Sequence, residues 1–364
     1  MKLLKEKIHN YRNILDATFE PSPTVTVICG ENGQGKTNLL ESIFLLSGAK
    51  SFRRAKDREM IGKDGPTFTT IDASFYAQHR EQEIHLSISE KGRMASLNKT
   101  GEKKAAELVG SFCCVVFSPD HLELVKGNPG ERRRFLDTAL CQLSSKYLHD
   151  LRMYTRTLQQ RNILLKEARN VSAAFDLLDV YDETLAASAS ELTIARRVFL
   201  EQLRQKAADA YGQVSGNREA LSMTYASTLF QEKESTEEAK KRLFATRSED
   251  LRMGYTTIGP HRDDITMLLN GEDARSFASQ GQQRTIVLSM KLAEAQMFES
   301  KLDEAPVLLL DDVLSELDEN RQTFLLERLE EIQAIITCCE PNFIERKTGA
   351  TVYRMDHGQL EKVN

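Results

Sequence analysis

Alternating apolar and polar residues dominate the first third of the chain. The alternation predicts half-buried strands over residues 2–12, 14–20, 71–75 and 83–89. A continuous apolar run at residues 112–117 predicts one further, fully buried strand. We therefore expect the N-terminal part of the chain to be rich in β-structure.

The pattern changes to long helical spacing from about residue 129 to residue 210. It breaks near residues 170–172, and two antiparallel helices would satisfy it. No heptad array of coiled-coil length is sustained here. Residues 211–250 are mixed and highly charged, for example at residues 231–234, and predict an edge strand with a short helix.

Buried strands return in the last third of the chain. Apolar runs predict strands at residues 265–269, 307–312 and 334–339, and helical spacing predicts helices at residues 279–300 and 318–333. The order strand, helix, strand, helix, strand is typical of an α/β fold.

Together these elements predict an α/β protein in three sequence segments. Residues 1–128 and 251–364 form the two halves of a head with a mixed sheet. Residues 129–250 form an inserted lobe, whose helices lie mostly in residues 129–210.

Composition adds bounds to this picture. The chain has 364 residues, of which 40% are hydrophobic and 28% charged, enough for one large domain or two with a substantial core. Its net charge of −5 does not indicate a polyanion-binding protein, although local patches decide such binding. The first residues lack the apolar core of a signal peptide, and about 18 apolar residues never run together, so we expect a cytoplasmic protein without membrane contact.

The six cysteines include two adjacent pairs, Cys113–Cys114 and Cys338–Cys339, and no C-x-x-C unit. Neighbouring residues of a strand point to opposite faces of the sheet. We therefore expect reduced, buried thiols rather than metal ligands or disulfides.

The stretch GENGQGKT, residues 30–37, matches the phosphate-binding pattern G-x-x-x-x-G-K-[ST] between a buried strand and a helix. Its glycines let backbone N–H groups close around phosphate oxygens, and the helix N-terminus adds positive partial charge. Lys36 would reach the β- and γ-phosphates of ATP, and the Thr37 hydroxyl would take one Mg²⁺ position. A glycine-rich turn that happens to carry a lysine is the alternative, but it does not require both flanks. The expected nucleotide-binding residues here are Gly30, Glu31, Asn32, Gly33, Gln34, Gly35, Lys36, Thr37 and Asn38.

Two carboxylates end the apolar run at residues 307–312. Asp311 would be delivered next to Mg²⁺, as the acidic strand end is in P-loop NTPases. Asp312 follows at the position where the ABC class places the carboxylate that orients or deprotonates the attacking water. The residue usual there is glutamate, which is one methylene longer. We hypothesise that the shorter reach of Asp312 helps to keep ATP hydrolysis slow.

The segment SQGQQR, residues 279–284, opens a helix and resembles the S-x-G-Q signature of ABC ATPases. In that class the serine, the glycine and the helix N-terminus bind the γ-phosphate that a second subunit's P-loop holds. Ser279, Gly281 and Gln282 would therefore act on ATP bound to a partner chain. Ser315–Asp318 resembles the D-loop that crosses the same dimer seam.

These motifs follow one another along essentially the whole chain, which closely resembles the RecF family of bacterial SMC-like ABC ATPases of recombinational repair. GPHRDD and SQGQQR are the most specific stretches, because ABC proteins in general lack them in this form. The stretches that carry the resemblance are NYRN at 10–13, GQGKTNLLE at 33–41, KSFR at 50–53, VFSPD at 116–120, RRRFLD at 132–137, LQQRN at 158–162, GPHRDD at 259–264 and SQGQQR at 279–284.

The resemblance implies an ABC-type P-loop ATPase head with an inserted helical lobe and no long coiled coil. It implies a weak, DNA-stimulated ATPase that uses ATP and Mg²⁺ and forms an ATP-dependent homodimer. It further implies binding to gapped DNA and to single- and double-strand junctions, where the family acts with RecR and RecO to help RecA load.

The resemblance also bears on single residues. It suggests that Arg12 meets the base or the phosphates of the nucleotide, and a surface arginine between strands is the equal alternative. The switch histidine of ABC proteins is absent, with Thr337–Cys338 in its place, so sensing of the γ-phosphate by histidine is not expected. The loop at Phe117–Pro119 lacks the usual glutamine ligand of Mg²⁺.

DNA binding requires several Lys or Arg side chains at phosphate spacing. The chain has no tryptophan and its basic clusters have few aromatic neighbours, so we expect phosphate-led binding without sequence preference rather than base stacking. Each basic cluster could instead be a solvated face or pair with nearby acids. The candidate DNA contacts are Arg53, Arg54, Lys56, Arg132, Arg133 and Arg134.

His261 stands beside Arg262, Asp263 and Asp264, without an identifiable nucleophile, so an ordering or interface role is favoured over direct chemistry.

Three other functions are possible for the whole chain. A small-molecule kinase would have no reason to carry the signature, and a transporter subunit fits poorly with the lobe and the missing histidine. An ATP-gated scaffold overlaps with the DNA-binding ATPase, since slow turnover is expected of both.

Overall fold

The structure is a computed structural model. It describes residues 1–48, 50–63, 65–167, 173–230, 235–329, 332–341, 344 and 348–364. Two of the segments discussed above, the expected helix break at residues 170–172 and the charged residues 231–234, lie outside the described residues.

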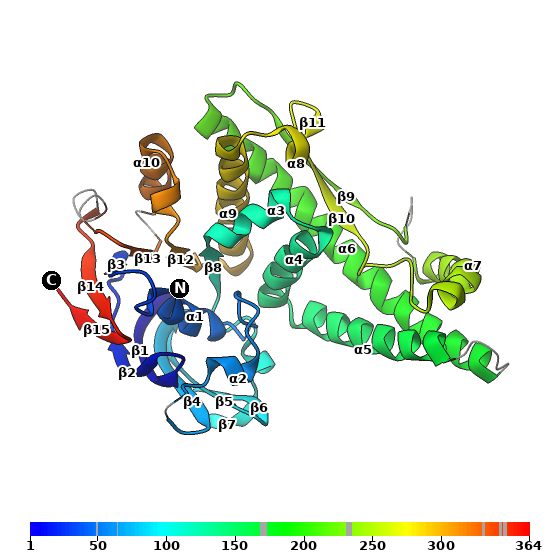
Figure 1. Ribbon diagram of the computed structural model, residues 1–364, viewed down its shortest axis with the longest axis horizontal. Helices are drawn as coiled ribbons and strands as arrows, with labels where there is room; N and C mark the ends of the chain where they lie inside the picture. The colour runs from blue at the N-terminus through cyan, green and yellow to red at the C-terminus, as the bar shows by residue number, and fades with distance from the viewer. Residues whose placement is uncertain are drawn as a thin grey trace.

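A six-stranded sheet in the order β15-β14-β3-β13-β12-β8 lies at the centre of the head (Figure 1). All its strands run parallel except β15, which pairs antiparallel with β14 at one edge. The bounds are β3 Val25–Cys29, β8 Cys114–Phe117, β12 Val307–Asp311, β13 Ala334–Cys338, β14 Thr351–Asp356 and β15 Gln359–Lys362. The sheet thus joins the first and last thirds of the chain.

A second, antiparallel sheet in the order β2-β1-β4-β5-β6-β7 comes wholly from the N-terminal third, which confirms its β-rich character. Strands β1 and β2 keep close to their predicted bounds, whereas β4 and β5 begin earlier than predicted because polar residues such as Thr69 and Gln82 are buried in them. The bounds are β1 Lys2–Tyr11, β2 Ile14–Phe19, β4 Phe68–Ala77, β5 Arg80–Ser89, β6 Gly92–Leu97 and β7 Thr100–Lys104.

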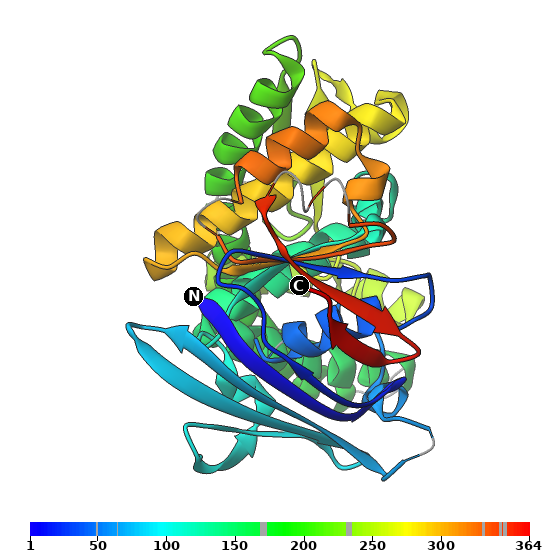
Figure 2. The ribbon, with the colours of Figure 1, turned by 90° about the vertical axis from the view of Figure 1, so that its left-hand side faces the viewer.

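Helix α1, Lys36–Leu45, lies between these two sheets (Figure 2). Its apolar residues share one core cluster with residues from both, for example Ile71 of β4 and Leu309 of β12. Because each face of the helix packs against a sheet, nearly the whole helix is buried. Packing on both sides therefore fixes the position of the P-loop helix relative to the central sheet.

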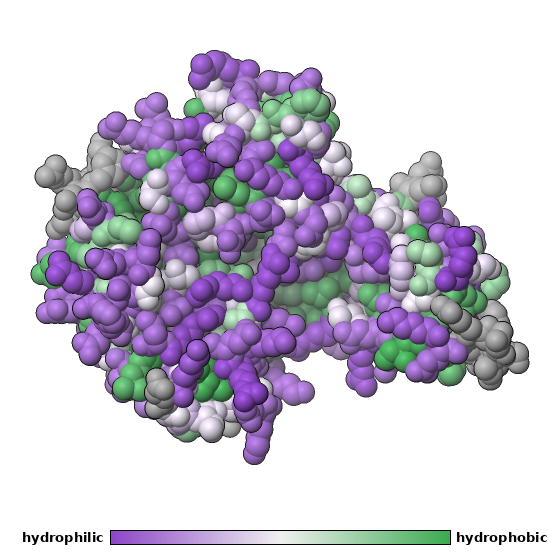
Figure 3. All heavy atoms as spheres, in the orientation of Figure 1, coloured by the Kyte–Doolittle hydropathy of each residue, from purple (hydrophilic) through white to green (hydrophobic). Residues whose placement is uncertain are grey.

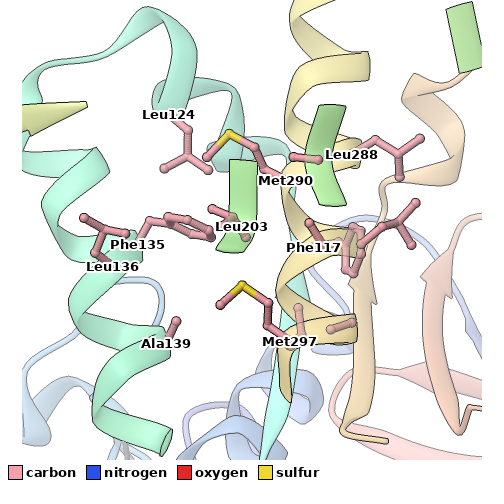
Figure 4. Packing of buried hydrophobic residues seen from close by; sticks show 14 of the residues in the cluster. Phe117, Leu124, Phe135, Leu136, Ala139, Leu203, Leu288, Met290 and Met297 are labelled. Carbon is pink, nitrogen blue, oxygen red and sulfur yellow. The ribbon is translucent and has the colours of Figure 1, made fainter. Parts of the chain in front are cut away.

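The opposite face of the central sheet is covered by α9, Gln280–Leu302, with α4, Pro129–Leu143, and α6, Ala173–Ser215 (Figure 4). Side chains along β8 alternate between two cores: Cys114 belongs to the α1 side and Val115 to the α9 side. All six cysteines are free. Four are buried as expected, but Cys141 is half-buried and Cys339 is exposed.

The arm on the right of Figure 1 consists of α5, Ser145–Glu167, α7, Thr236–Met253, and the N-terminal part of α6. The face shown in Figure 3 is mostly hydrophilic. The helical pattern over residues 129–210 forms three helices, α4, α5 and α6, rather than the two expected. Helix α6 has 43 residues and continues to Ser215, beyond the expected end near residue 210, because its C-terminal half leaves the arm and packs on α9. Among the described residues, no helix combines the length and apolar character needed to span a membrane.

A three-stranded sheet, in the order β11-β10-β9, connects the arm to the head. Its bounds are β9 Leu221–Ala226, β10 Asp264–Leu269 and β11 Glu272–Asp273. Strand β9 comes from the expected lobe segment and pairs with β10 of the C-terminal segment, so the sheet crosses that proposed boundary. The division into residues 1–128, 129–250 and 251–364 stays a prediction.

Short helices complete the described part of the chain. Helix α10 ends at Glu327, earlier than expected, since Gln333 turns inward and binds the backbone of Leu3 in β1. The bounds are α2 Asp57–Met60, α3 Glu123–Lys126, α8 Ala274–Phe277 and α10 Glu319–Glu327, with 3₁₀ turns at Ala105–Leu108, Pro119–Leu122 and Leu314–Glu316.

Candidate nucleotide site

The P-loop connects the carboxyl end of β3 to the first turn of α1. The Lys36 ammonium lies inside the loop, where it donates to the carbonyl oxygens of Gly30 at 2.5 Å and Glu31 at 2.9 Å. A Cβ at Gly30 would lie 2.3 Å from the Met355 carbonyl oxygen, so no other residue fits there. The lysine is therefore positioned at the helix N-terminus, where a phosphate would be favoured.

Gly35 has a φ of 118°, and a Cβ there would lie 2.8 Å from Oδ1 of Asn13. Asn13 was missed as a site residue, although it belongs to the NYRN stretch. Its amide donates to the Gln34 carbonyl oxygen at 3.0 Å and accepts from Asn38 at 2.7 Å. The β1–β2 turn thus holds the back of the P-loop.

Three oxygens converge where β12 ends. The Thr37 hydroxyl donates to Oδ1 of Asp311 at 2.8 Å, and the Thr337 hydroxyl donates to the same oxygen at 3.0 Å. Burial raises the pKa of Asp311, and the two hydroxyls oppose the rise. A cation here would stabilise the ionised carboxylate that burial disfavours.

This donor set fits Mg²⁺. Hydroxyl and carboxylate oxygens are its preferred ligands, and it is held by one or two protein groups together with phosphates and water rather than by a protein cage. Thr37 and Asp311 are the residues that would hold the ion.

Asp312 follows in a left-handed backbone conformation, with a φ of 53°. Its N–H donates to the Thr337 hydroxyl at 2.9 Å, and the Ser315 hydroxyl lies 3.0 Å from its Oδ1. The buried Thr337, at the position of the switch histidine, thus contacts the carboxylate of Asp311 and the backbone N–H of Asp312. Its role escaped prediction, because a threonine in a strand carries no sign of it.

A fully buried carboxylate, Glu41 on α1, organises the other side of the loop. It accepts from Arg12 at 2.6 and 3.0 Å and from the Ser51 hydroxyl, and the Arg53 guanidinium lies 4.0 Å away. Arg53 also donates to the Asn38 side chain at 2.8 Å. Arg12 thus lies against α1 in this structure, and its contact with a nucleotide stays a prediction.

The P-loop opens into a cleft that the predicted phosphate and metal residues share. Asp120, which was not predicted as a site residue, brings a carboxylate to the cleft from the loop that lacks glutamine. The lining residues are Glu31, Asn32, Gly33, Gln34, Gly35, Lys36, Thr37, Asn38, Phe52, Arg53, Ser118, Pro119, Asp120, Asp311 and Asp312.

The predicted signature lies outside this lining. Ser279 is the N-cap of α9, and its hydroxyl accepts from the Gln282 N–H at 3.3 Å while Oε1 of Gln282 accepts from the Ser279 N–H at 2.7 Å. The amide of Gln282 donates to Glu219 at 2.5 Å. The structure therefore presents the signature as a preformed helix start that does not serve the chain's own P-loop.

The candidate DNA contacts divide into buried and exposed groups. The structure corrects the prediction for Arg132, which is 5% exposed and donates to both carboxylate oxygens of Asp264, at 2.6 and 2.9 Å. Arg133 is half-buried and donates to the Asp263 carbonyl oxygen at 2.8 Å. Their charges tie α4 to β10 rather than face a ligand.

The remaining candidates lie near one another or near the cleft. Arg54 and Arg134 both pair with Glu131, so the two basic clusters meet on one surface, which the sequence alone did not show. Lys56 is exposed. Arg53 lines the nucleotide cleft.

His261 orders the junction between arm and head. Its Nε2 lies 3.1 Å from the Thr256 carbonyl oxygen, which can only accept, so Nδ1 accepts from the Tyr154 hydroxyl at 2.7 Å. Burial lowers the pKa of His261 to about 4, so the ring is neutral at physiological pH. Such contacts fit a structural role for His261, in which it holds Tyr154 of α5 against the segment at Thr256.

Comparison with known proteins agrees with this geometry. The family model described as RecF/RecN/SMC N terminal domain matches residues 2–362. A DNA replication and repair protein RecF from an Exiguobacterium species is 38% identical, with 99% of each chain covered, and one from Macrococcus caseolyticus is 39% identical at the same coverage.

Solved structures show the same relationship. A structure described as the recombination mediator protein RecF-ATPrS in the RecFOR pathway superposes with a TM-score of 0.92 at 33% identity, over 100% of this chain and 98% of the other. The Smc head domain from Pyrococcus furiosus superposes with a TM-score of 0.56 at 15% identity, over 100% and 96%, which shows a shared fold.

Proposed function

The chain belongs to the RecF family of SMC-like ABC ATPases, and from that premise we propose that it is an ATP-dependent DNA-binding protein of recombinational repair. ATP binds along the P-loop with its terminal phosphates at Lys36, and Mg²⁺ binds between Thr37 and Asp311. Asp312 orients the attacking water, and hydrolysis to ADP and phosphate is slow.

One observation carries the proposal: the P-loop and the signature are both formed, but they lie apart in one chain. Lys36, Thr37 and Asp311 line the cleft, whereas Ser279 and Gln282 do not. A second copy related by two-fold symmetry would supply its signature to this cleft and receive the same in return. Each ATP thus contacts both chains and links them in a dimer.

The dimer closes on DNA at gaps and at junctions of single- and double-stranded segments. Phosphate contacts dominate this binding, so it depends steeply on salt and little on sequence. In the cell the complex works with RecR and RecO to help RecA load. The name of the ATP-analogue-bound relative, which places that protein in the RecFOR pathway, supports these partners.

Complementation of two inactive variants tests the proposal. Lys36→Met destroys the P-loop and Ser279→Arg destroys the signature, so each variant alone should lose DNA-stimulated ATP hydrolysis. Mixed in equal amounts, they form heterodimers in which one cleft combines an intact Lys36 with an intact Ser279, and we expect part of the wild-type rate to return.

The matched control is a mixture of Lys36→Met with a Lys36→Met/Ser279→Arg double variant, in which neither cleft is complete. Activity in Ser279→Arg alone equal to that of the wild type would contradict the composite site. Hydrolysis that persists undiminished in Lys36→Met would contradict the ATPase itself.

A further inference from the structure

The outer face of α5 is basic, in a chain whose net charge is negative. Exposed residues at spacings of three and four, His149, Arg152, Arg156, Gln160 and Ile163, lie along one side of the helix. No acidic residue interrupts this side before Glu167 at its end. Exposed helix faces usually intersperse both signs of charge, so this face differs from an ordinary solvated one.

The two arginines at its centre have no partner. Neither Arg152 nor Arg156 makes a hydrogen bond or ion pair within the described part of the chain. Some basic residues elsewhere in the arm are paired, for example Lys146 with Asp150 and Lys240 with Glu183. Arg152 and Arg156 therefore keep their full donor capacity for an external anion.

Helix α5 follows α4, which packs on the central sheet, after the single residue Ser144, so this side of the arm begins beside the head. We define the basic strip as Arg152 and Arg156.

We propose that the basic strip is a contact surface for the phosphate backbone of DNA, which assigns a DNA-binding role to the arm. The inference rests on the proposed DNA-binding function and names where on the chain that binding occurs. Arginines one helical turn apart have Cβ atoms about 5–6 Å from each other, and a duplex carries about one charge per 1.7 Å of its axis, so both guanidinium groups find phosphates in any register.

The test compares two double variants that remove the same charge from the arm. Arg152→Ala/Arg156→Ala alters the strip, and Lys240→Ala/Lys241→Ala alters helix α7 and serves as the control. Binding of a gapped duplex is measured by fluorescence anisotropy over a range of salt concentrations, with ATP present. Nucleotide binding and the far-ultraviolet circular dichroism spectrum are recorded for each protein.

We expect the strip variant to bind DNA several-fold more weakly at physiological salt. Its slope of log affinity against log salt should be smaller by about 1.8, because two phosphate contacts are lost at roughly 0.9 each. The control should keep the wild-type slope, and both variants should keep nucleotide binding.

The possible results distinguish a failure of the proposed DNA-binding function from a failure of the proposed contact at the basic strip. Wild-type protein that fails to bind DNA contradicts the proposed function. Wild-type protein that binds DNA while the strip variant binds with the same affinity and slope overturns the inference. Equal losses in both double variants also overturn it, since binding would then follow total charge rather than the strip.

Discussion

At the scale of single residues, Asp312 shows how the environment sets a catalytic group. Its left-handed backbone suits Asp better than Glu, because the short polar side chain tolerates that conformation. The Ser315 hydroxyl, 3.0 Å from Oδ1, and the Thr337 hydroxyl, 2.9 Å from the backbone nitrogen, fix its orientation. A short carboxylate held in this way is expected to position water poorly.

Replacing Asp312 by Glu tests that hypothesis. The longer side chain should raise the rate of ATP hydrolysis at saturating ATP and DNA by roughly tenfold, a part of the total contribution of a general base. Asp312→Asn, which keeps the length but removes the base, should abolish hydrolysis while ATP still binds. An unchanged or lowered rate in Asp312→Glu would show that the length of this side chain does not limit ATP hydrolysis.

Glu6 is a second residue whose environment decides its chemistry. It lies fully buried on β1 beneath α1, and neither of its carboxyl oxygens has a hydrogen-bond partner among the described residues. Burial raises the pKa of Glu6 to about 8. The group is therefore protonated in the folded protein at neutral pH, whereas the unfolded chain ionises it.

The consequence is a stability that falls as pH rises. The folded-state pKa lies above the unfolded value of 4.5, so the contribution is full below that pH and is lost towards pH 8. Over this interval the free energy of unfolding should fall by about 1.4 kcal/mol per pH unit relative to a Glu6→Gln variant, which cannot titrate. Urea denaturation at several pH values measures the difference. Parallel curves for the two proteins would mean that Glu6 is ionised in the fold.

Sequence revealed the site residues whose role is local and missed those that depend on distant contacts. Lys36, Thr37 and Asp311 follow from motifs that contain their own strand and helix context. Glu41 and Thr337 could not be found in this way, because their partners lie 29 and 26 residues away. For the same reason Arg132 was misread as a DNA contact, since Asp264, 132 residues away, holds it in the interior.

At the scale of elements, periodicity predicted the type of most helices and strands but not their extent. The signature helix begins with Ser279 as its N-cap, as expected, because the capping box SQGQ is local. Helix α6 continues to Ser215, past the expected end of the helical pattern near residue 210, since its end is set by packing against α9 rather than by a cap signal. Propensity predicts that a helix forms, and tertiary contacts decide where it ends.

Elements also explain how the site is held. Strand β13 lies between the P-loop strand β3 and the acidic strand β12 and brings Thr337 between their functional ends. Helix α1 is fixed between two sheets, and the β1–β2 turn supports the P-loop through Asn13. Each part of the cleft therefore rests on a different element.

At the scale of the whole molecule, we propose that the chain carries two halves of a nucleotide site, which do not meet within one copy. One half is the cleft with Lys36, Thr37, Asp311 and Asp312, and the other is the exposed start of α9. Two chains related by a two-fold axis would join these halves twice. We therefore propose that ATP binding brings two copies of this protein together as a dimer.

Sedimentation velocity with and without ATP tests this claim most directly. We predict that ATP converts the wild-type protein from monomer to dimer, and that Ser279→Arg binds ATP normally yet stays monomeric, because only the half-site offered to the partner is damaged. Lys36→Met, which should neither bind ATP productively nor dimerise, is the control. A wild-type protein that ATP leaves unchanged, or a Ser279→Arg variant that dimerises as the wild type does, would contradict the account.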